Sequence, residues 1–144
     1  MQNRLFQLRE NSNFTQKEIA NKFGISRQLY SSWETGKRTI PLKRLNDICN
    51  YYNTSMDYVL LLSNKKENNN TNKVNMLNKK EIGDRIRLIR ENNNLTLRQL
   101  ATELNTTSST ISAYETSKTL ILTEFAFQIC KKYNLSLDWL CCRN

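Results

Sequence analysis

Apolar residues recur at intervals of three and four over several short stretches of the chain, which is the spacing of amphipathic α-helices. In the first half of the sequence these stretches cover about residues 2–11, 15–23, 27–34, 42–51 and 56–60. The three glycines and one proline of the chain are too few for the many turns of a β-rich fold. The pattern therefore predicts an all-α fold, with five short helices in this half.

Residues that favour helix ends stand at the boundaries of these stretches. Thr15 and Glu18 have the spacing of a capping box, and Ser26 is suited to cap the third helix. Gly24 can adopt the positive φ that commonly ends a helix, and Pro41 favours the first position of the fourth helix. These signals agree with the helices that the hydrophobic periodicity predicts.

The same pattern returns 81 residues later without a gap. Residues 4–60 and 85–141 are identical at about 18 of 57 aligned positions. A repeat of this length is a domain, because solenoid repeats have periods of about 20–50 residues. We therefore expect two tandem five-helix domains, at residues 1–62 and 78–144, joined by a polar, basic and flexible linker at residues 63–77.

The net charge of +9 is unevenly distributed along the chain. Residues 1–62 contribute about +4, residues 63–80 about +4, and residues 81–144 about +1. A basic excess attracts nucleic acid phosphates through counterion release. Double-stranded DNA is therefore the expected partner, and the two copies are not expected to be electrostatically equivalent.

The sequence contains no histidine and four cysteines. No Cys–His nucleophile pair can form, and no set of cysteines or carboxylates has the spacing of metal ligands. Cys49 and Cys130 are interpreted as small buried hydrophobic residues. We therefore expect no enzymatic activity, no cofactor and no metal. Because no run of 18 apolar residues and no signal segment is visible, we expect a cytoplasmic protein without a membrane partner.

Residues 15–34 have the organisation of a helix-turn-helix, in which two helices are joined by a short turn containing glycine. Ala20 supplies the small side chain that a close helix crossing requires, and Ile25 and Tyr30 are expected to fill the angle between the helices. The second helix would then present its first turn to the major groove of DNA, which is wide enough to admit an α-helix.

Several separated motifs of the first copy occur in a characteristic order. They are Thr15-Gln16-x-x-Ile19-Ala20, Gly24-Ile25-Ser26, Trp33-Glu34-Thr35-Gly36-Lys37 and Ser55-Met56-Asp57-Tyr58-Val59-Leu60. The second copy matches through Thr96, Ala101, Ile111-Ser112, Tyr114-Glu115-Thr116 and residues 135–140. With these motifs the chain resembles the Cro and phage-repressor (Xre-like) helix-turn-helix family. The resemblance implies two λ-repressor-like domains, sequence-specific DNA binding and transcriptional regulation, with repression as the expected outcome.

The resemblance also implies roles for individual residues of the first copy. Arg27, Gln28, Ser31 and Ser32 lie where the family reads base edges, and arginine and glutamine can form bidentate hydrogen bonds with guanine and adenine. Contacts with the DNA backbone are implied for Gln16, Thr35, Gly36, Lys37 and Arg38.

Two charged pairs are expected to be structural rather than DNA-reading. The family pairs the positions of Arg9 and Glu34 in a partly buried salt bridge, and the equivalents in the second copy are Arg90 and Glu115. Removing one partner of such a pair should cost about 3–5 kcal/mol, because the other charge is left buried without compensation.

The second copy departs from the family pattern at the DNA-reading positions. Arg27 and Gln28 are replaced by Ser108 and Ser109, and Gln16 by Leu97. The weaker DNA-binding candidates of this copy are Ser108, Ser109 and Lys118. A self-association surface is predicted from four apolar residues, Leu120, Ile121, Phe125 and Phe127.

Two functions remain open from the sequence. In the first, the chain is a DNA-binding regulator in which the first copy reads DNA and the second assists, either in a homodimer or in an intramolecular pseudo-dimer. In the alternative, the chain is a protein-interaction or antitoxin-like co-regulator whose second copy binds a protein partner. An exposed apolar patch on the second copy would favour the alternative.

Overall fold

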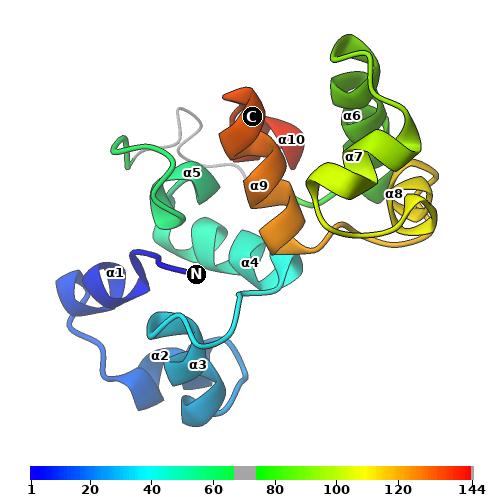
Figure 1. Cartoon of the computed structure of the whole chain (residues 1–144). Coiled ribbons are helices and arrows are strands. Elements are labelled where there is room, and N and C mark those ends of the chain that lie inside the picture. The colour runs from blue at the N-terminus through cyan, green and yellow to red at the C-terminus, as the bar shows by residue number, and fades with distance from the viewer. Residues whose placement is uncertain (67–73, 144) are drawn as a thin grey trace. The chain divides into compact units, whose positions relative to one another are not determined.

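The computed structural model describes residues 1–66 and 74–143. All regular elements in these ranges are helices, which confirms the predicted all-α fold (Figure 1). None of these helices combines the length and the hydrophobicity that crossing a bilayer requires. The chain divides into two compact units, Met1–Val74 and Asn75–Asn144. Residues 67–73 of the predicted linker lie outside the described residues.

The first unit contains five short helices around a common core. Each helix contributes an apolar side chain that is at most 2% exposed, namely Leu5, Ile19, Trp33, Leu45 and Met56. The predicted periodicity therefore corresponds to one shared hydrophobic core. The helices are α1 (Leu5–Asn11), α2 (Gln16–Lys22), α3 (Arg27–Glu34), α4 (Leu42–Tyr52) and α5 (Met56–Val59).

Side-chain caps define the start of three of these helices, and the caps of α2 and α3 agree with the prediction. Ser55 caps α5 by accepting a hydrogen bond from Tyr58 N. Thr15 Oγ1 accepts a hydrogen bond from Glu18 N, and the Glu18 carboxylate accepts one from Thr15 N, so the capping box is complete. The Ser26 hydroxyl accepts a hydrogen bond from Leu29 N and caps α3.

Two helix boundaries differ from the prediction. Helix α1 begins at Leu5 rather than near residue 2, because the Asn3 side chain accepts a hydrogen bond from Leu5 N and donates one to the Trp33 carbonyl. These bonds hold the preceding residues against the end of α3 instead of in a helix. Pro41 has a ψ of 143° and therefore lies one residue before the first helical position of α4.

The second unit repeats the five-helix order with a longer first helix. Asn78 caps this helix by accepting a hydrogen bond from Glu81 N. A Cβ atom at Gly83 would lie 2.5 Å from the Tyr114 carbonyl oxygen, so the close approach of the first and third helices of this unit requires glycine. The helices are α6 (Lys79–Asn92), α7 (Leu97–Glu103), α8 (Ser108–Glu115), α9 (Thr123–Tyr133) and α10 (Leu137–Leu140).

The second unit also ends on a buried ion pair that the sequence analysis did not identify. Arg143 Nε lies 3.2 Å from Asp138 Oδ1, and the two side chains are 1% and 5% exposed. The equivalent positions of the first unit are Asp57 and Leu62, so the first unit cannot form this pair. The two copies are therefore stabilised differently at their last helix.

The first part of the predicted linker is bonded to the first unit. The Lys66 carbonyl accepts hydrogen bonds from Thr54 Oγ1 at 2.8 Å and from Ser55 N at 3.4 Å. The Arg4 guanidinium donates to the Ser63 carbonyl at 2.8 Å. Residues 63–66 thus contact Arg4, which precedes α1, and the segment that precedes α5.

Candidate nucleic-acid interface

A tight turn sets the angle between α2 and α3. Gly24 has a φ of +65°, a conformation that glycine adopts without strain, and Ile25 N donates a hydrogen bond to the Ala20 carbonyl at 3.0 Å. Ala20 is buried, and α2 packs against α3. The segment Gly24-Ile25-Ser26 therefore ends one helix and begins the next.

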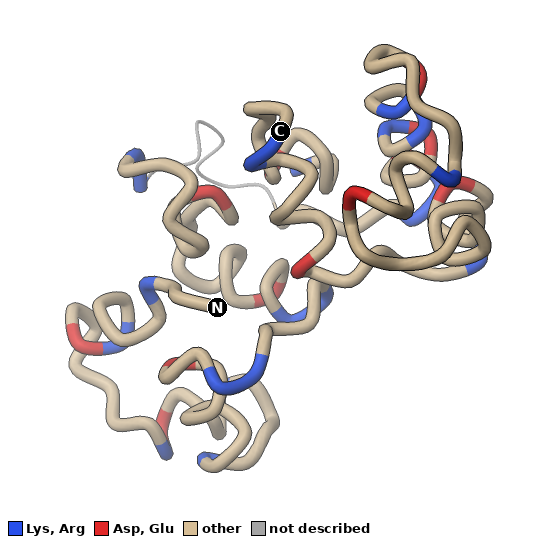
Figure 2. Tube along the Cα trace, in the orientation of Figure 1, with Lys and Arg blue, Asp and Glu red and all other residues tan. Residues whose placement is uncertain are grey.

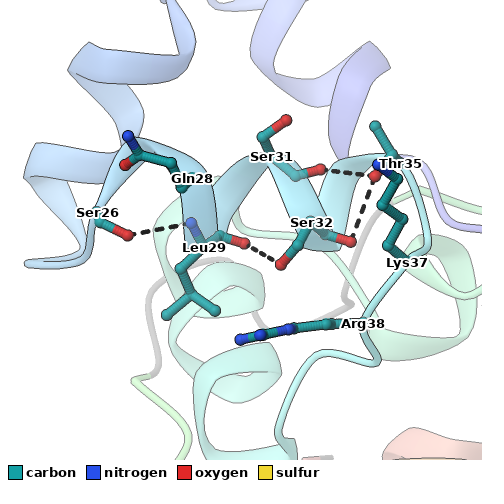
Figure 3. Close-up of a pocket in the computed structure, with 8 residues that line it drawn as sticks. All are labelled: Ser26, Gln28, Leu29, Ser31, Ser32, Thr35, Lys37 and Arg38. Carbon is teal, nitrogen blue, oxygen red and sulfur yellow. Dashed lines mark hydrogen bonds between the residues drawn. The ribbon is translucent and has the colours of Figure 1, made fainter.

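Helix α3 has one buried face and one open face. Tyr30 and Trp33 are at most 2% exposed. The open face borders a groove that contains six of the nine predicted DNA-binding residues of the first unit (Figure 3). Arg27, which is exposed at the start of α3, lies outside the lining, as do Gln16 and Gly36. The groove is lined by Ser26, Gln28, Leu29, Ser31, Ser32, Thr35, Lys37 and Arg38.

The polar side chains of this groove differ in their freedom to bind a ligand. Ser32 Oγ donates a hydrogen bond to the Leu29 carbonyl at 2.6 Å, and Thr35 Oγ1 donates one to the Ser31 carbonyl at 2.9 Å. These hydroxyls can still accept hydrogen bonds, but the helix occupies their protons. Among the described residues, the Gln28 amide has no hydrogen-bond partner, so its donor and its acceptor are both available for a base edge.

Two exposed cations line the groove and a third is exposed at the start of α3, and none of the three forms an ion pair within the described ranges. They are Arg27, Lys37 and Arg38. Lys37 and Arg38 belong to the basic segment that follows α3, drawn in blue between α3 and α4 in Figure 2. Arg38 N donates a hydrogen bond to the Ser32 carbonyl at 3.0 Å, which holds this segment against α3. The unpaired charges give this face a positive potential.

Beside the groove, Glu34 forms a bidentate ion pair with Arg9. Arg9 Nε and Nη2 lie 3.0 and 2.9 Å from the two carboxylate oxygens, and Arg9 Nη1 donates to the Phe14 carbonyl. Burial opposes ionisation of Glu34, but hydrogen bonds from Arg9 and its other neighbours outweigh burial and lower the pKa of the carboxyl group. Gln16 Nε2 lies 3.4 Å from Glu34 Oε1, so the ion pair also orients the Gln16 side chain.

The equivalent face of the second unit carries fewer groups that could bind DNA. Lys118 is the one cation of its lining. Arg90 Nε lies 2.8 Å from the Glu115 carboxylate, as Arg9 pairs with Glu34 in the first unit, and Arg87 Nε lies 3.2 Å from the same carboxylate. The lining consists of Leu97, Ser108, Ser109, Ser112, Ala113 and Lys118.

The predicted self-association surface of the second unit is not a continuous exposed patch. Ile121 is 2% exposed because it occupies the core position that Ile40 occupies in the first unit, so its inclusion is wrong. The exposed neighbour is Leu122, at 50%. The other three predicted members, Leu120, Phe125 and Phe127, are each partly buried.

Two residues of these faces were missed by the sequence analysis. Leu29 lies three positions before Ser32, and Arg87 lies three positions before Arg90. Residues three apart are neighbours on a helix surface, so this spacing was the available signal. Within the described ranges, no group of three or more acidic or thiol side chains could hold a metal ion.

Comparison with known proteins gives a match for each unit. A helix-turn-helix family model matches residues 5–59, and a helix-turn-helix domain model matches residues 83–142. Two similar proteins of Bacillus subtilis (strain 168) are described as uncharacterized HTH-type transcriptional regulators. YobD is 35% identical over 60 residues, which are 42% of this chain and 54% of YobD. YqaE is 38% identical over 52 residues, which are 36% of this chain and 45% of YqaE.

The chain thus spans about half the length of the curated relatives it matches. Among solved structures, the P22 c2 repressor in complex with a synthetic operator is 25% identical, with a TM-score of 0.41, over 44% of this chain and 96% of that one. The clp gene regulator ClgR of Corynebacterium glutamicum is 20% identical, with a TM-score of 0.41, over 48% of this chain and 90% of that one.

The two family matches cover both units, and each includes the pair of helices joined by a tight turn that the structure contains. The first match contains the motifs from Thr15 to Lys37, and the second contains their equivalents from Thr96 to Lys118. The chain therefore belongs to the Xre-like helix-turn-helix family, as the sequence motifs predicted, and carries two such domains in tandem.

Proposed function

We propose that this chain is a sequence-specific DNA-binding transcriptional regulator whose first domain reads the major groove with α3. The observation that carries this proposal is the open face of α3. An amide free to bind a base edge, that of Gln28, lies in one groove with two unpaired cations, Lys37 and Arg38, and Arg27 is exposed at the start of the same helix.

The proposal divides the predicted residues by the kind of contact that they make. Arg27 and Gln28 read bases, and Ser31 and Ser32 are secondary base contacts. Contacts with the DNA backbone are made by residues beside these readers. Gln16 Nε2 lies 3.4 Å from Glu34 Oε1, and this hydrogen bond aligns the Gln16 side chain for a phosphate. The other backbone contacts are Thr35, Gly36, Lys37 and Arg38.

In this proposal the second domain assists rather than reads DNA. Its equivalent face offers Ser108, Ser109 and one cation, Lys118, which suit a weak contact with the backbone. A first domain bound to a promoter would occupy that DNA and block its use, so repression is the proposed regulatory outcome. The relatives described as HTH-type transcriptional regulators support a role in transcription.

Selection from a pool of random double-stranded DNA tests the proposal. The full chain should enrich one sequence family, and its affinity for that site should exceed its affinity for unrelated DNA by about 10³-fold or more. Enrichment that yields no common sequence, with binding that depends on salt alone, would contradict sequence-specific recognition.

Lys37→Ala is expected to weaken binding to all DNA alike. The Lys37 ammonium group is exposed and has no ion-pair partner within the described residues, so it suits a phosphate, which carries no sequence information. Loss of one phosphate contact should lower the slope of log affinity against log salt by about 1. Titrations at several salt concentrations, with the selected site and with random DNA, measure both effects. An unchanged slope together with a loss confined to the selected site would contradict a backbone role for Lys37.

A further inference from the structure

The groove along the open face of α3 contains one apolar side chain, that of Leu29. The other residues that line it are polar or charged (Figure 3). The large apolar residues deeper in α3, Tyr30 and Trp33, are 1% and 2% exposed, whereas Leu29 is only partly buried. Scattered surface leucines are common in proteins, so the informative property of Leu29 is its position rather than its exposure.

Leu29 lies in the first turn of α3, directly after Gln28. Its amide donates to the Ser26 hydroxyl at 3.1 Å, and its carbonyl accepts a hydrogen bond from Ser32 Oγ at 2.6 Å. The backbone of Leu29 is therefore held by side chains on both sides. A recognition helix presents its N-terminal residues to base edges in the major groove. In Figure 3 the Leu29 side chain lies on the side of α3 that carries Ser32, a proposed base contact, and points away from Gln28.

We propose that Leu29 is a specificity-determining residue that recognises the C5-methyl group of a thymine. Thymine is the one DNA base that carries a methyl group in the major groove, and an apolar side chain discriminates it by contact. This inference rests on the proposed function of the first domain. Removing one methyl group from such a contact should weaken binding about four-fold, because this is the contribution of one buried methylene group to the affinity.

The second domain has no apolar residue at the position equivalent to Leu29. Thr110 takes the place of Leu29, and its hydroxyl lies 2.9 Å from Thr107 Oγ1 in a hydrogen bond. Thr110 is also absent from the lining of the equivalent face. An apolar side chain at this position of the recognition helix is therefore found in the first domain and not in the second.

Replacement of thymine by deoxyuridine tests the assignment, because the two bases differ by the methyl group alone. The full chain first selects its site from random DNA, and each thymine of that site is then replaced in turn. At least one replacement should weaken binding about four-fold. The effect should disappear in Leu29→Ala and persist in Leu29→Met. It should also persist in Leu62→Ala, a matched control at a partly buried leucine outside the groove.

Two results would overturn the assignment and leave the proposed function intact. In the first, every deoxyuridine-substituted site binds as tightly as the selected site. In the second, the methyl effect persists in Leu29→Ala, and another side chain then reads the thymine. The deoxyuridine series uses the unaltered protein and does not depend on the folding of any variant. Failure to select any site would overturn the proposed function itself.

Discussion

An Arg27→Ala, Gln28→Ala double variant of the full chain is expected to lose sequence-specific DNA binding while the first domain stays folded. Both side chains are exposed on the first turn of α3. Each bidentate contact with a base contributes roughly 1–3 kcal/mol of discrimination, so loss of both should weaken specific binding by about 30-fold to 10⁴-fold. Gel-shift titration with the selected site measures the loss, and thermal unfolding of the same variant checks the fold.

The second domain provides the matched control for this variant. Ser108→Ala with Ser109→Ala alters the equivalent positions, and the affinity for the selected site should change less than about two-fold, within the scatter of surface substitutions. Equal losses in the two double variants would contradict the assignment of base reading to the first domain. A loss that is the same for the selected site and for random DNA would mean that Arg27 and Gln28 contact the backbone alone.

Glu34→Ala is expected to lower the free energy of unfolding of the first domain by about 3–5 kcal/mol, because it leaves Arg9 buried without its partner. The two side chains are 5% and 10% exposed and form a bidentate pair. The two domains can unfold separately, so the measurement requires a probe in the first domain alone. In a Trp139→Phe background, the fluorescence of the buried Trp33 follows urea unfolding of that domain.

Glu10→Ala is the control for this substitution, because Glu10 contacts the same arginine from the surface. Arg9 Nη1 lies 3.5 Å from Glu10 Oε1, and the Glu10 side chain is 55% exposed. An exposed pair contributes at most about 1 kcal/mol, so Glu10→Ala should have a small effect. Equal costs of the two substitutions would show that burial of the Arg9–Glu34 pair does not determine its contribution.

The Arg9–Glu34 pair also determines whether the stability of the first domain rises or falls with pH. The pKa of Glu34 is lower in the folded domain than in the unfolded chain, where glutamate has a pKa of about 4.3. The contribution of Glu34 is therefore complete above that value and is lost as the pH falls through the lower, folded-state pKa. In the Glu34→Ala variant, the loss of stability on acidification should be smaller than in the unaltered chain.

The sequence by itself determined the helical fold, the tandem repeat and the helix-turn-helix. These features depend on local physics. The 3.6-residue periodicity, the Thr15–Glu18 capping box, the Ser26 cap and the positive φ of Gly24 each involve residues within one or two turns of one another. The family motifs consist largely of these local signals, and the two family matches agree with them.

Tertiary structure alone decided which side chains are exposed and which are bonded. Periodicity could not distinguish the buried Ile121 from the exposed Leu122, because burial there depends on where the chain enters α9. The close contact of Gly83 with the Tyr114 carbonyl joins residues that are distant in sequence. Such packing depends on how helices meet in space, and the pattern along one helix does not contain that information.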